Sequence, residues 1–175
     1  MTERRNLTAR VTWLEMTARP GRHVPMPMKP RLALMRAEAM PVAFYRYLYE
    51  QVGRDHHWYL RRAMGDEELA SVIHAPATSI TVLHANGSPA GFFELESSRL
   101  PEAVEIAYFG LTRDFTGQGL GRWFLSTAIQ AGWDLLPSKL TVHTNSLDHP
   151  AALALYQKMG FVPVAVSEEE VEWWA

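Results

Sequence analysis

The chain has 175 residues, of which 47% are hydrophobic and 21% are charged, with a net charge of −2 and no cysteine. These values are typical of one globular domain with its own core, and they exclude disulfides, thiolate metal sites and a thiol nucleophile. No apolar run approaches the ~18 residues of a membrane helix, and the N-terminus lacks the apolar block of a signal peptide. We therefore expect a single domain over residues 1–175, located in the cytoplasm and without a membrane partner.

The two ends of the chain differ in charge. The first fifty residues contain nine Lys or Arg against four acidic residues, but they are scattered, which indicates a solvated surface and no nucleic-acid partner. We interpret residues 1–30 as an N-terminal extension and residues 167–175, with four glutamates, as an acidic tail. The tail is either disordered or docked through Trp173 and Trp174, on the domain or on the partner subunit of a homodimer. Docking is favoured because two adjacent tryptophans are costly to leave in water.

The first third of the chain predicts two strands separated by an irregular segment. Residues 8–16 can form a leading strand. Prolines in the segment 20–30 remove backbone donors and fix φ, so they block regular structure there. Residues 31–39 predict a core strand, although the same run also suits a helix.

Helices and a hairpin are expected next. Apolar and aromatic residues recur at helical spacing over residues 42–52, and short helices follow over residues 55–64 and 66–73. The pair Asn86-Gly87 separates two short strand runs and predicts a β-hairpin over residues 80–95. Residues 102–111 predict the next strand, joined to the hairpin by the turn 97–101. 

A glycine-rich turn follows that strand. Gly117, Gly119 and Gly121 alternate, and apolar residues at helical spacing come directly after them, so the turn begins a helix. A helix N-terminus presents unpaired N–H groups and the positive end of the helix dipole, which suits a phosphate. Arg122 and Trp123 stand where a mononucleotide P-loop needs Lys and then Ser or Thr, and the alternate spacing does not fit a dinucleotide fingerprint.

The last third predicts a strand, a helix and a second strand. Residues 141–143 alternate as a short strand. Asp148 can cap a helix whose first turn contains Pro150 and which Gly160 ends. Residues 161–164 return to an extended conformation.

Two of these motifs resemble the GCN5-related N-acetyltransferases. Residues 116–121, Thr-Gly-Gln-Gly-Leu-Gly, are similar to that family's coenzyme A loop, Gln/Arg-x-x-Gly-x-Gly/Ala, except that Thr116 replaces the Gln or Arg. Residues 141–164 resemble its closing strand, helix and strand. The resemblance, over residues 31–166, implies the acyl-CoA N-acyltransferase fold in the α/β (α+β) class. That fold is a mixed, mostly antiparallel sheet of six to seven strands, flanked by helices and with splayed central strands.

The resemblance also implies a function. We expect acetyl-CoA as co-substrate, no metal, and transfer of acetyl to a primary amine, most simply of a small molecule, by direct attack in a ternary complex. The alternatives are a catalytically silent coenzyme A sensor or interaction domain, and the same fold with another acyl donor or a protein acceptor. Adjacent His56 and His57 point to different sides of a helix, while His143 and His149 lack a carboxylate at ligand spacing, which disfavours a metal site.

Acetyl transfer requires a neutral amine, a polarised carbonyl and a proton for the leaving thiolate. Glu105 is the predicted base, because it lies six residues before Leu111, where the histone-modifying branch of the family places its catalytic glutamate. The alternatives are that Glu105 is a solvent-facing or ion-paired strand glutamate, that a chain of waters acts instead, or that the base is Glu94, Glu96 or Glu102 on adjacent strand ends. Tyr156 is the predicted acid from its place in the Leu-Tyr pair of the motif, and the alternative is a packed helix residue.

Further residues are implied to bind the coenzyme. The backbone of Phe109 and Leu111 is expected to pair with its pantetheine arm, and Gly110 between them fits a bulge or splay. Asn145 is expected to hydrogen-bond the same arm, the alternative being a turn former at a strand end. The other implied contacts are Thr112, Thr116, Gly117, Gln118, Gly119, Leu120, Gly121 and Arg122. The aromatic residues over 45–59 are expected to be mostly core, with some lining an acceptor pocket.

Overall fold

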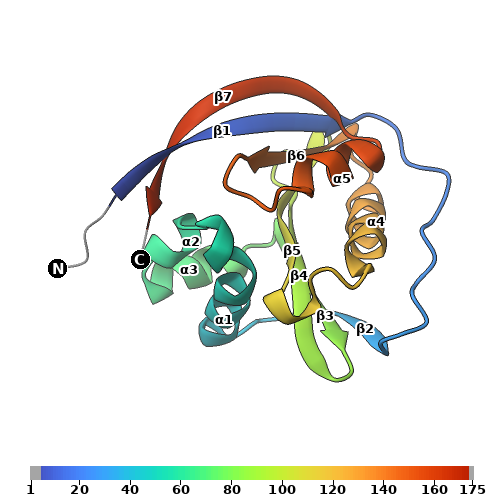
Figure 1. Ribbon diagram of the computed structural model, residues 1–175, viewed down its shortest axis with the longest axis horizontal. Coiled ribbons are helices and arrows are strands. Elements are labelled where there is room, and N and C mark those ends of the chain that lie inside the picture. The colour runs from blue at the N-terminus through green and yellow to red at the C-terminus, as the bar shows by residue number, and fades with distance from the viewer. Residues whose placement is uncertain (1–4, 174–175) are drawn as a thin grey trace.

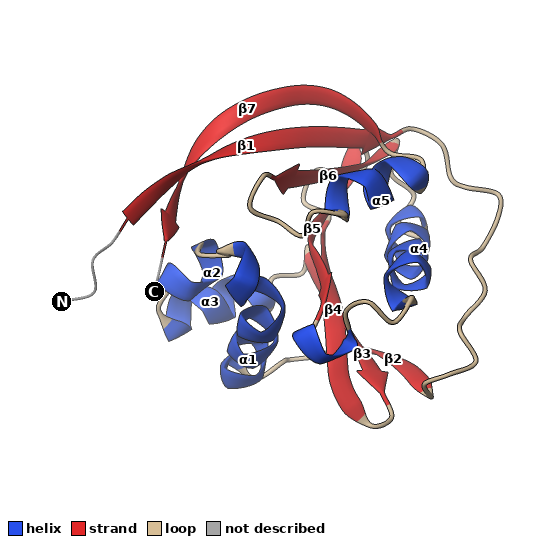
Figure 2. Ribbon diagram, viewed as in Figure 1, coloured by secondary structure: helices blue, strands red, loops and turns tan. Residues whose placement is uncertain are grey.

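The computed structural model describes residues 5–173, which form one seven-stranded sheet with helices on both faces (Figures 1 and 2). The strand order is β2-β3-β4-β5-β6-β1-β7, and every neighbouring pair is antiparallel except β5 and β6. The predicted fold class is therefore confirmed. The strands are β1 (Arg5–Met16), β2 (Leu32–Arg36), β3 (Thr78–Ala85), β4 (Ser88–Glu96), β5 (Ala103–Leu111), β6 (Lys139–Asn145) and β7 (Val162–Trp173). The helices are α1 (Val42–Gly53), α2 (Leu60–Ala63), α3 (Asp66–Ile73), α4 (Leu120–Trp133) and α5 (Ala152–Lys158).

Two hydrophobic cores lie on opposite faces of the sheet. One core packs α4 against the sheet, around Phe93, Phe124 and Leu140. The second core packs α1 and α3 against β3 and β4, around Tyr45, Leu69 and Phe92. The sheet is therefore covered by α1–α3 on one face and by α4 and α5 on the other, as Figure 2 shows.

Within the described residues, the segments interpreted as an extension and a tail both contribute strands to this sheet. β1 lies between β6 and β7 and pairs with both. Residues 167–173 form the second half of β7, and the register places Arg10 opposite Glu168 and Thr8 opposite Glu170. Strand pairing with β1 therefore orders this acidic segment. The predicted docking of the Trp173 and Trp174 side chains lies outside the described residues.

Two local predictions also change. The helix expected over residues 55–64 is a 3₁₀ turn at Arg54–His56 followed by the four-residue α2, because His57 takes a left-handed φ of 55° that interrupts the helix. α5 begins at Ala152, and its N-cap residue has no side-chain hydrogen bond, so Asp148 does not cap it. The hairpin of β3 and β4 is confirmed, with Asn86 and Gly87 both at positive φ.

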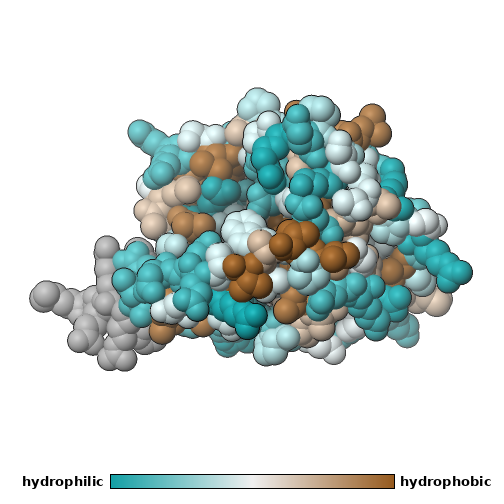
Figure 3. All heavy atoms as spheres, turned by 90° about the horizontal axis from the view of Figure 1, so that it is seen from above, coloured by the Kyte–Doolittle hydropathy of each residue, from teal (hydrophilic) through white to brown (hydrophobic). Residues whose placement is uncertain are grey.

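The outer surface includes exposed hydrophobic side chains at one edge of the sheet. Val162, Val164 and Val166 alternate along β7 and are exposed, and Trp13 on the neighbouring β1 is partly exposed. In the view from above the molecule, hydrophobic residues lie among hydrophilic ones (Figure 3). Nothing in this arrangement specifies a second subunit, so the homodimer stays a prediction.

Candidate active site

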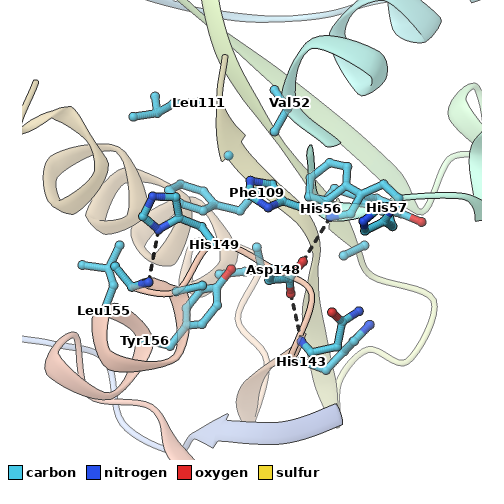
Figure 4. A pocket seen from close by; sticks show the side chains of 18 of the residues that line it. Val52, His56, His57, Phe109, Leu111, His143, Asp148, His149, Leu155 and Tyr156 are labelled. Atoms are coloured by element: carbon cyan, nitrogen blue, oxygen red, sulfur yellow. Dashed lines mark hydrogen bonds between the residues drawn. The ribbon is translucent and has the colours of Figure 1, made fainter. Parts of the chain in front are cut away.

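A cavity of about 310 Å³ lies where β5 and β6 separate. These two strands pair only between Ala103–Glu105 and Lys139–Thr141, and beyond this point β5 has no partner on that side. Side chains from β5, β6, α5 and the loops after α1 project into the gap (Figure 4). The predicted splay of the central strands is therefore present, and it opens the cavity.

The free edge of β5 is turned toward this gap. The N–H of Thr112 donates to the carbonyl oxygen of Ala90 at 2.8 Å, which makes Leu111 and Gly91 a non-hydrogen-bonded pair of the antiparallel ladder. Phe109, two residues earlier in the same ladder, also forms a non-hydrogen-bonded pair, with Phe93 of β4. The backbone N–H and C=O groups of Phe109 and Leu111 thus point away from β4, and both residues line the cavity.

Gly110 lies in the splayed part of β5, as one of the two expected alternatives had it, but not in a bulge. The register of β4 and β5 shifts at Ala107, where β5 has one extra residue, whereas Gly110 pairs regularly with Phe92. A Cβ atom on Gly110 would lie 2.4 Å from Cγ1 of Val52 on α1. Gly110 therefore allows α1 to approach the splayed strand closely, and the bulge itself lies three residues earlier.

The glycine-rich loop connects the end of β5 to α4. Gly117 and Gly119 have φ values of 77° and 78°, which L-residues with side chains rarely adopt, and an added Cβ at either position would meet nothing within 4 Å. Gly119 is the N-cap of α4, where no side chain caps the helix and no acidic residue lies in the first turn. The N-terminus of α4 is thus an uncapped positive helix end beside open space.

The residues implied to bind a coenzyme divide into two groups. Those that line the cavity are Phe109, Leu111, Thr116, Gly117, Gly121 and Asn145. Those that do not line it are Thr112, Gln118, Gly119, Leu120 and Arg122. The Thr116 hydroxyl donates to the carbonyl oxygen of Thr112 at 3.1 Å, and Asn145 Oδ1 accepts from the N–H of Leu147 at 2.8 Å, so both side chains also stabilise their loops. The hydroxyl of buried Thr112 has no hydrogen-bond partner among the described residues.

Tyr156 of α5 projects into the cavity, with its hydroxyl toward the centre (Figure 4). The residue is buried, and its ring packs edge-on against Phe161 with 6.0 Å between the ring centroids. Burial raises the pKa of Tyr156, and the negative charge of Asp148 raises it further. The phenol therefore keeps its proton at neutral pH and can donate it.

Glu105 and His143 form a pair at the point where the strands separate. Oε1 of Glu105 lies 3.2 Å from Nδ1 of His143, and Arg99 Nη2 lies 3.9 Å from the other carboxylate oxygen. The hydrogen bond from His143 lowers the pKa of Glu105, and the same bond raises the pKa of His143. His143 lines the cavity, whereas Glu105 does not. The imidazole thus stands between the predicted base and the cavity.

The far end of the cavity is aromatic. The rings of Tyr49, Trp58 and Tyr108 contact one another, with centroid separations of 5.0–5.3 Å. Trp58 Nε1 donates to Asp148 at 3.3 Å, which links the loop after α1 to the loop after β6. As expected, part of the aromatic N-terminal region lines the cavity, while Tyr45 is fully buried core.

Sequence reasoning missed the role of two acidic residues. Asp148 accepts from the Thr144 hydroxyl at 2.6 Å and from the Asn145 N–H at 2.9 Å, so it fixes the β6–α5 loop instead of capping α5. Glu169 of β7 lines the cavity, although its segment was interpreted as a tail. The Asp148 contacts are local but depend on the conformation of the loop, whereas the place of Glu169 depends on the pairing of β7 with the distant β1. The pairing of Glu105 with His143, 38 residues apart, could have been found only by aligning two strands in parallel.

Among the described residues, no group of three or more His, Asp or Glu side chains is placed to hold a metal ion. None of the described helices is both long enough and apolar enough to cross a membrane.

Solved structures share this fold. A GCN5-related N-acetyltransferase from Sphaerobacter thermophilus superposes with a TM-score of 0.63 and 15% identity over 97% of this chain and 53% of its own. A GCN5-related N-acetyltransferase from Kribbella flavida gives 0.58 and 14%, over 97% and 60% respectively. An aminoglycoside acetyltransferase from an uncultured soil metagenomic sample gives 0.60 and 12%, over 75% and 89%. The chain thus spans less than two thirds of the length of the first two proteins.

At the sequence level, no curated protein matches significantly. The sequence profile of the acetyltransferase (GNAT) family, however, matches residues 37–161, which include the splayed strand, the glycine-rich loop and α5. With most of the sequence covered by this match and the fold shared as well, the chain belongs to the acetyltransferase (GNAT) family.

Proposed function

We propose that the protein is an acetyl-CoA-dependent N-acetyltransferase that moves an acetyl group to a primary amine of a small molecule by direct attack in a ternary complex. The gap between β5 and β6 is the observation that carries this proposal. Three features meet there: the free backbone edge of Phe109 and Leu111, the glycine-rich loop and the Tyr156 hydroxyl. Together they match the needs of acyl transfer from a thioester, namely a binding edge, a phosphate site and a proton donor.

The residues present fit coenzyme A. The positive-φ glycines leave the space at the α4 N-terminus open, where side chains would fill it. We assign the diphosphate to the loop 116–121 with Arg122, and the pantetheine arm to the edge of β5 with Thr112 and Asn145. Acetyl-CoA supplies an activated acetyl group when bound. The protein's own part is to align the amine, remove its proton and hold a proton at the Tyr156 hydroxyl for the departing sulfur.

The direct test is release of free thiol from acetyl-CoA in the presence of amines. Because the chain has no cysteine, a thiol reagent meets no background from the protein. The panel contains 2-phenylethylamine, L-phenylalanine, L-phenylalaninamide, spermidine and kanamycin. Acceptor-dependent release supports the enzyme. Coenzyme A binding without release for any amine supports the sensor, another acyl donor or a protein acceptor.

The lining of the cavity favours an amine with an aromatic body and no acid group. Its charged carboxylates are Asp148 and Glu169, and among the described lining residues there is no Lys or Arg. A cationic amine is attracted by these carboxylates and by the ring faces of Tyr49, Trp58 and Tyr108. A carboxylate on the acceptor would meet the negative charges of Asp148 and Glu169, and among the described lining residues only histidines could offset that repulsion.

We therefore expect kcat/KM for 2-phenylethylamine to exceed that for L-phenylalanine by at least about 10-fold, since the added carboxylate is repelled by Asp148 and Glu169. L-phenylalaninamide is the matched control, because it keeps the size of the amino acid and removes its charge, and it should recover most of the rate. Equal kcat/KM values for the amino acid and its amide would contradict this assignment of the acceptor.

Tyr156→Phe tests the proton donor. Removing one buried hydroxyl should lower kcat by about 100-fold, the lower end of the range for a general acid, while the Kd of coenzyme A stays unchanged. Steady-state kinetics and calorimetric titration with coenzyme A measure the two effects separately. Unchanged kcat in the variant would remove Tyr156 from this role.

A further inference from the structure

We propose that His143 is the group that takes the proton from the acceptor amine, and that Glu105 is a positioning residue that acts through His143. This inference rests on the proposed acetyl transfer. It replaces Glu105 as the direct base, because only the imidazole of the pair reaches the cavity. The register of β5 and β6 explains the order of the two groups: Glu105 is the last paired residue, and His143 lies two residues beyond its partner Thr141, where the gap has opened.

The imidazole is held in one orientation from two sides. Its Nδ1 faces the Glu105 carboxylate at 3.2 Å, so Nε2 is directed away from that carboxylate. Trp13 lies directly opposite His143 on β1, and the two rings pack with centroids 4.7 Å apart at an interplanar angle of 36°. Trp13 is itself fixed by a hydrogen bond from Nε1 to the Ser167 hydroxyl at 3.0 Å. Since Nδ1–H donates to Glu105, the neutral ring has its free lone pair at Nε2.

The charges around the ring make it a stronger base. Glu105 faces it from β5, Asp148 from the β6–α5 loop and Glu169 from β7, while Arg99 offsets part of the charge of Glu105. The hydrogen bond from Nδ1 to Glu105 is the largest of the causes that raise the pKa of His143 above its ordinary 6.5. The same carboxylates attract an ammonium group into the cavity and stabilise the imidazolium that forms when the proton is transferred.

The proposed step balances without another reactant. The ammonium group first loses one proton to solvent, and the neutral amine nitrogen then forms its bond to the acetyl carbon as the carbon–sulfur bond breaks and gives a second proton to Nε2 of His143. The sulfur leaves with the electron pair of the broken bond and takes a proton from the Tyr156 hydroxyl. Transfer of the proton from the imidazolium to solvent and re-protonation of Tyr156 restore the starting state, with Glu105 ionised throughout.

The test is the pH dependence of kcat/KM with acetyl-CoA and 2-phenylethylamine. In the unaltered protein, the rate should rise with pH through a pKa above 6.5, since only the neutral imidazole accepts a proton. His143→Gln should lower kcat by about 100-fold and remove this rise, leaving only the ionisation of the amine itself at higher pH. Glu105→Gln should cause a smaller loss and shift the rise to lower pH, because the acceptor of the Nδ1–H loses the negative charge that helps to raise the pKa of the imidazole.

Two controls separate this role from a structural one. His84→Gln on β3 and Glu67→Gln on α3 make the same chemical changes outside the cavity, so they should leave the profile unaltered. An NMR titration of the His143 ring protons should give a lower pKa in Glu105→Gln than in the unaltered protein. The inference is overturned if the rate of His143→Gln still rises with pH at the same pH as in the unaltered protein. It is also overturned if Glu105→Gln abolishes the rise in rate instead of shifting it to lower pH. If the unaltered protein acetylates no amine, the proposed function and this inference fail together, whereas the outcomes with the variants overturn the inference alone.

Discussion

Gly119→Glu should abolish coenzyme A binding, with Kd raised by at least about 100-fold, because a like charge is placed where the phosphates are expected. Gly119 is the N-cap of α4, and the space beyond its Cα is open to at least 4 Å, so a carboxylate can occupy it. The new side chain would neutralise the positive helix end and repel the diphosphate. Calorimetric titration with coenzyme A measures the loss without depending on the identity of the acceptor.

The hairpin of β3 and β4 offers a matched control. Gly87 has a φ of 86°, close to the 78° of Gly119, and an added Cβ there would also meet nothing within 4 Å. Gly87→Glu therefore imposes the same backbone strain and the same charge far from the cavity, and it should bind coenzyme A normally. Equal, undiminished binding by both variants would mean that the loop 116–121 does not hold the phosphates.

Features that depend on a few neighbouring residues could be predicted from the sequence. The Asn86-Gly87 hairpin and the glycine-rich start of α4 are both short-range patterns, and the structure has both. The two motifs in order also indicated the family and the splayed sheet. In each case the local backbone conformation follows from the residues themselves, through positive φ at glycine or helical spacing of apolar side chains.

Features that depend on strand register or on the conformation of a loop could not be predicted. The acidic end of the chain becomes ordered only because β1 accepts it as a partner, and β1 lies more than 150 residues earlier in the sequence. Asp148 looked like a helix cap because its neighbours suit a helix start, but its carboxylate finds closer donors on Thr144 and Asn145. The position of Glu105 in the sequence indicated that it is important. Its contact with the imidazole of His143, however, follows from the parallel register of β5 and β6, which the sequence does not give.

Arg61→Met should destabilise the protein by about 3–5 kcal/mol, because it leaves a buried carboxylate without its charged partner. Glu94 is fully buried on β4, where it accepts from Arg61 Nη2 at 2.7 Å and from the Tyr45 hydroxyl at 2.6 Å. The Arg61 guanidinium also lies over the ring of Tyr108, 5.3 Å from its centroid. Denaturant unfolding followed by tryptophan fluorescence gives the change in the free energy of unfolding.

The surface pair of Arg19 and Asp134 provides the comparison. The Arg19 and Asp134 side chains are 45% and 65% exposed, against 1% for Glu94, so Arg19→Met should cost no more than about 1 kcal/mol. The double variant Arg61→Met with Glu94→Gln should be more stable than Arg61→Met alone, since no unpaired charge stays buried. If the two single arginine variants lose the same stability, the buried pair is not what supports α2 against the sheet. The aromatic end of the cavity depends on this support, because Tyr108 has Arg61 against its ring and also lines the cavity.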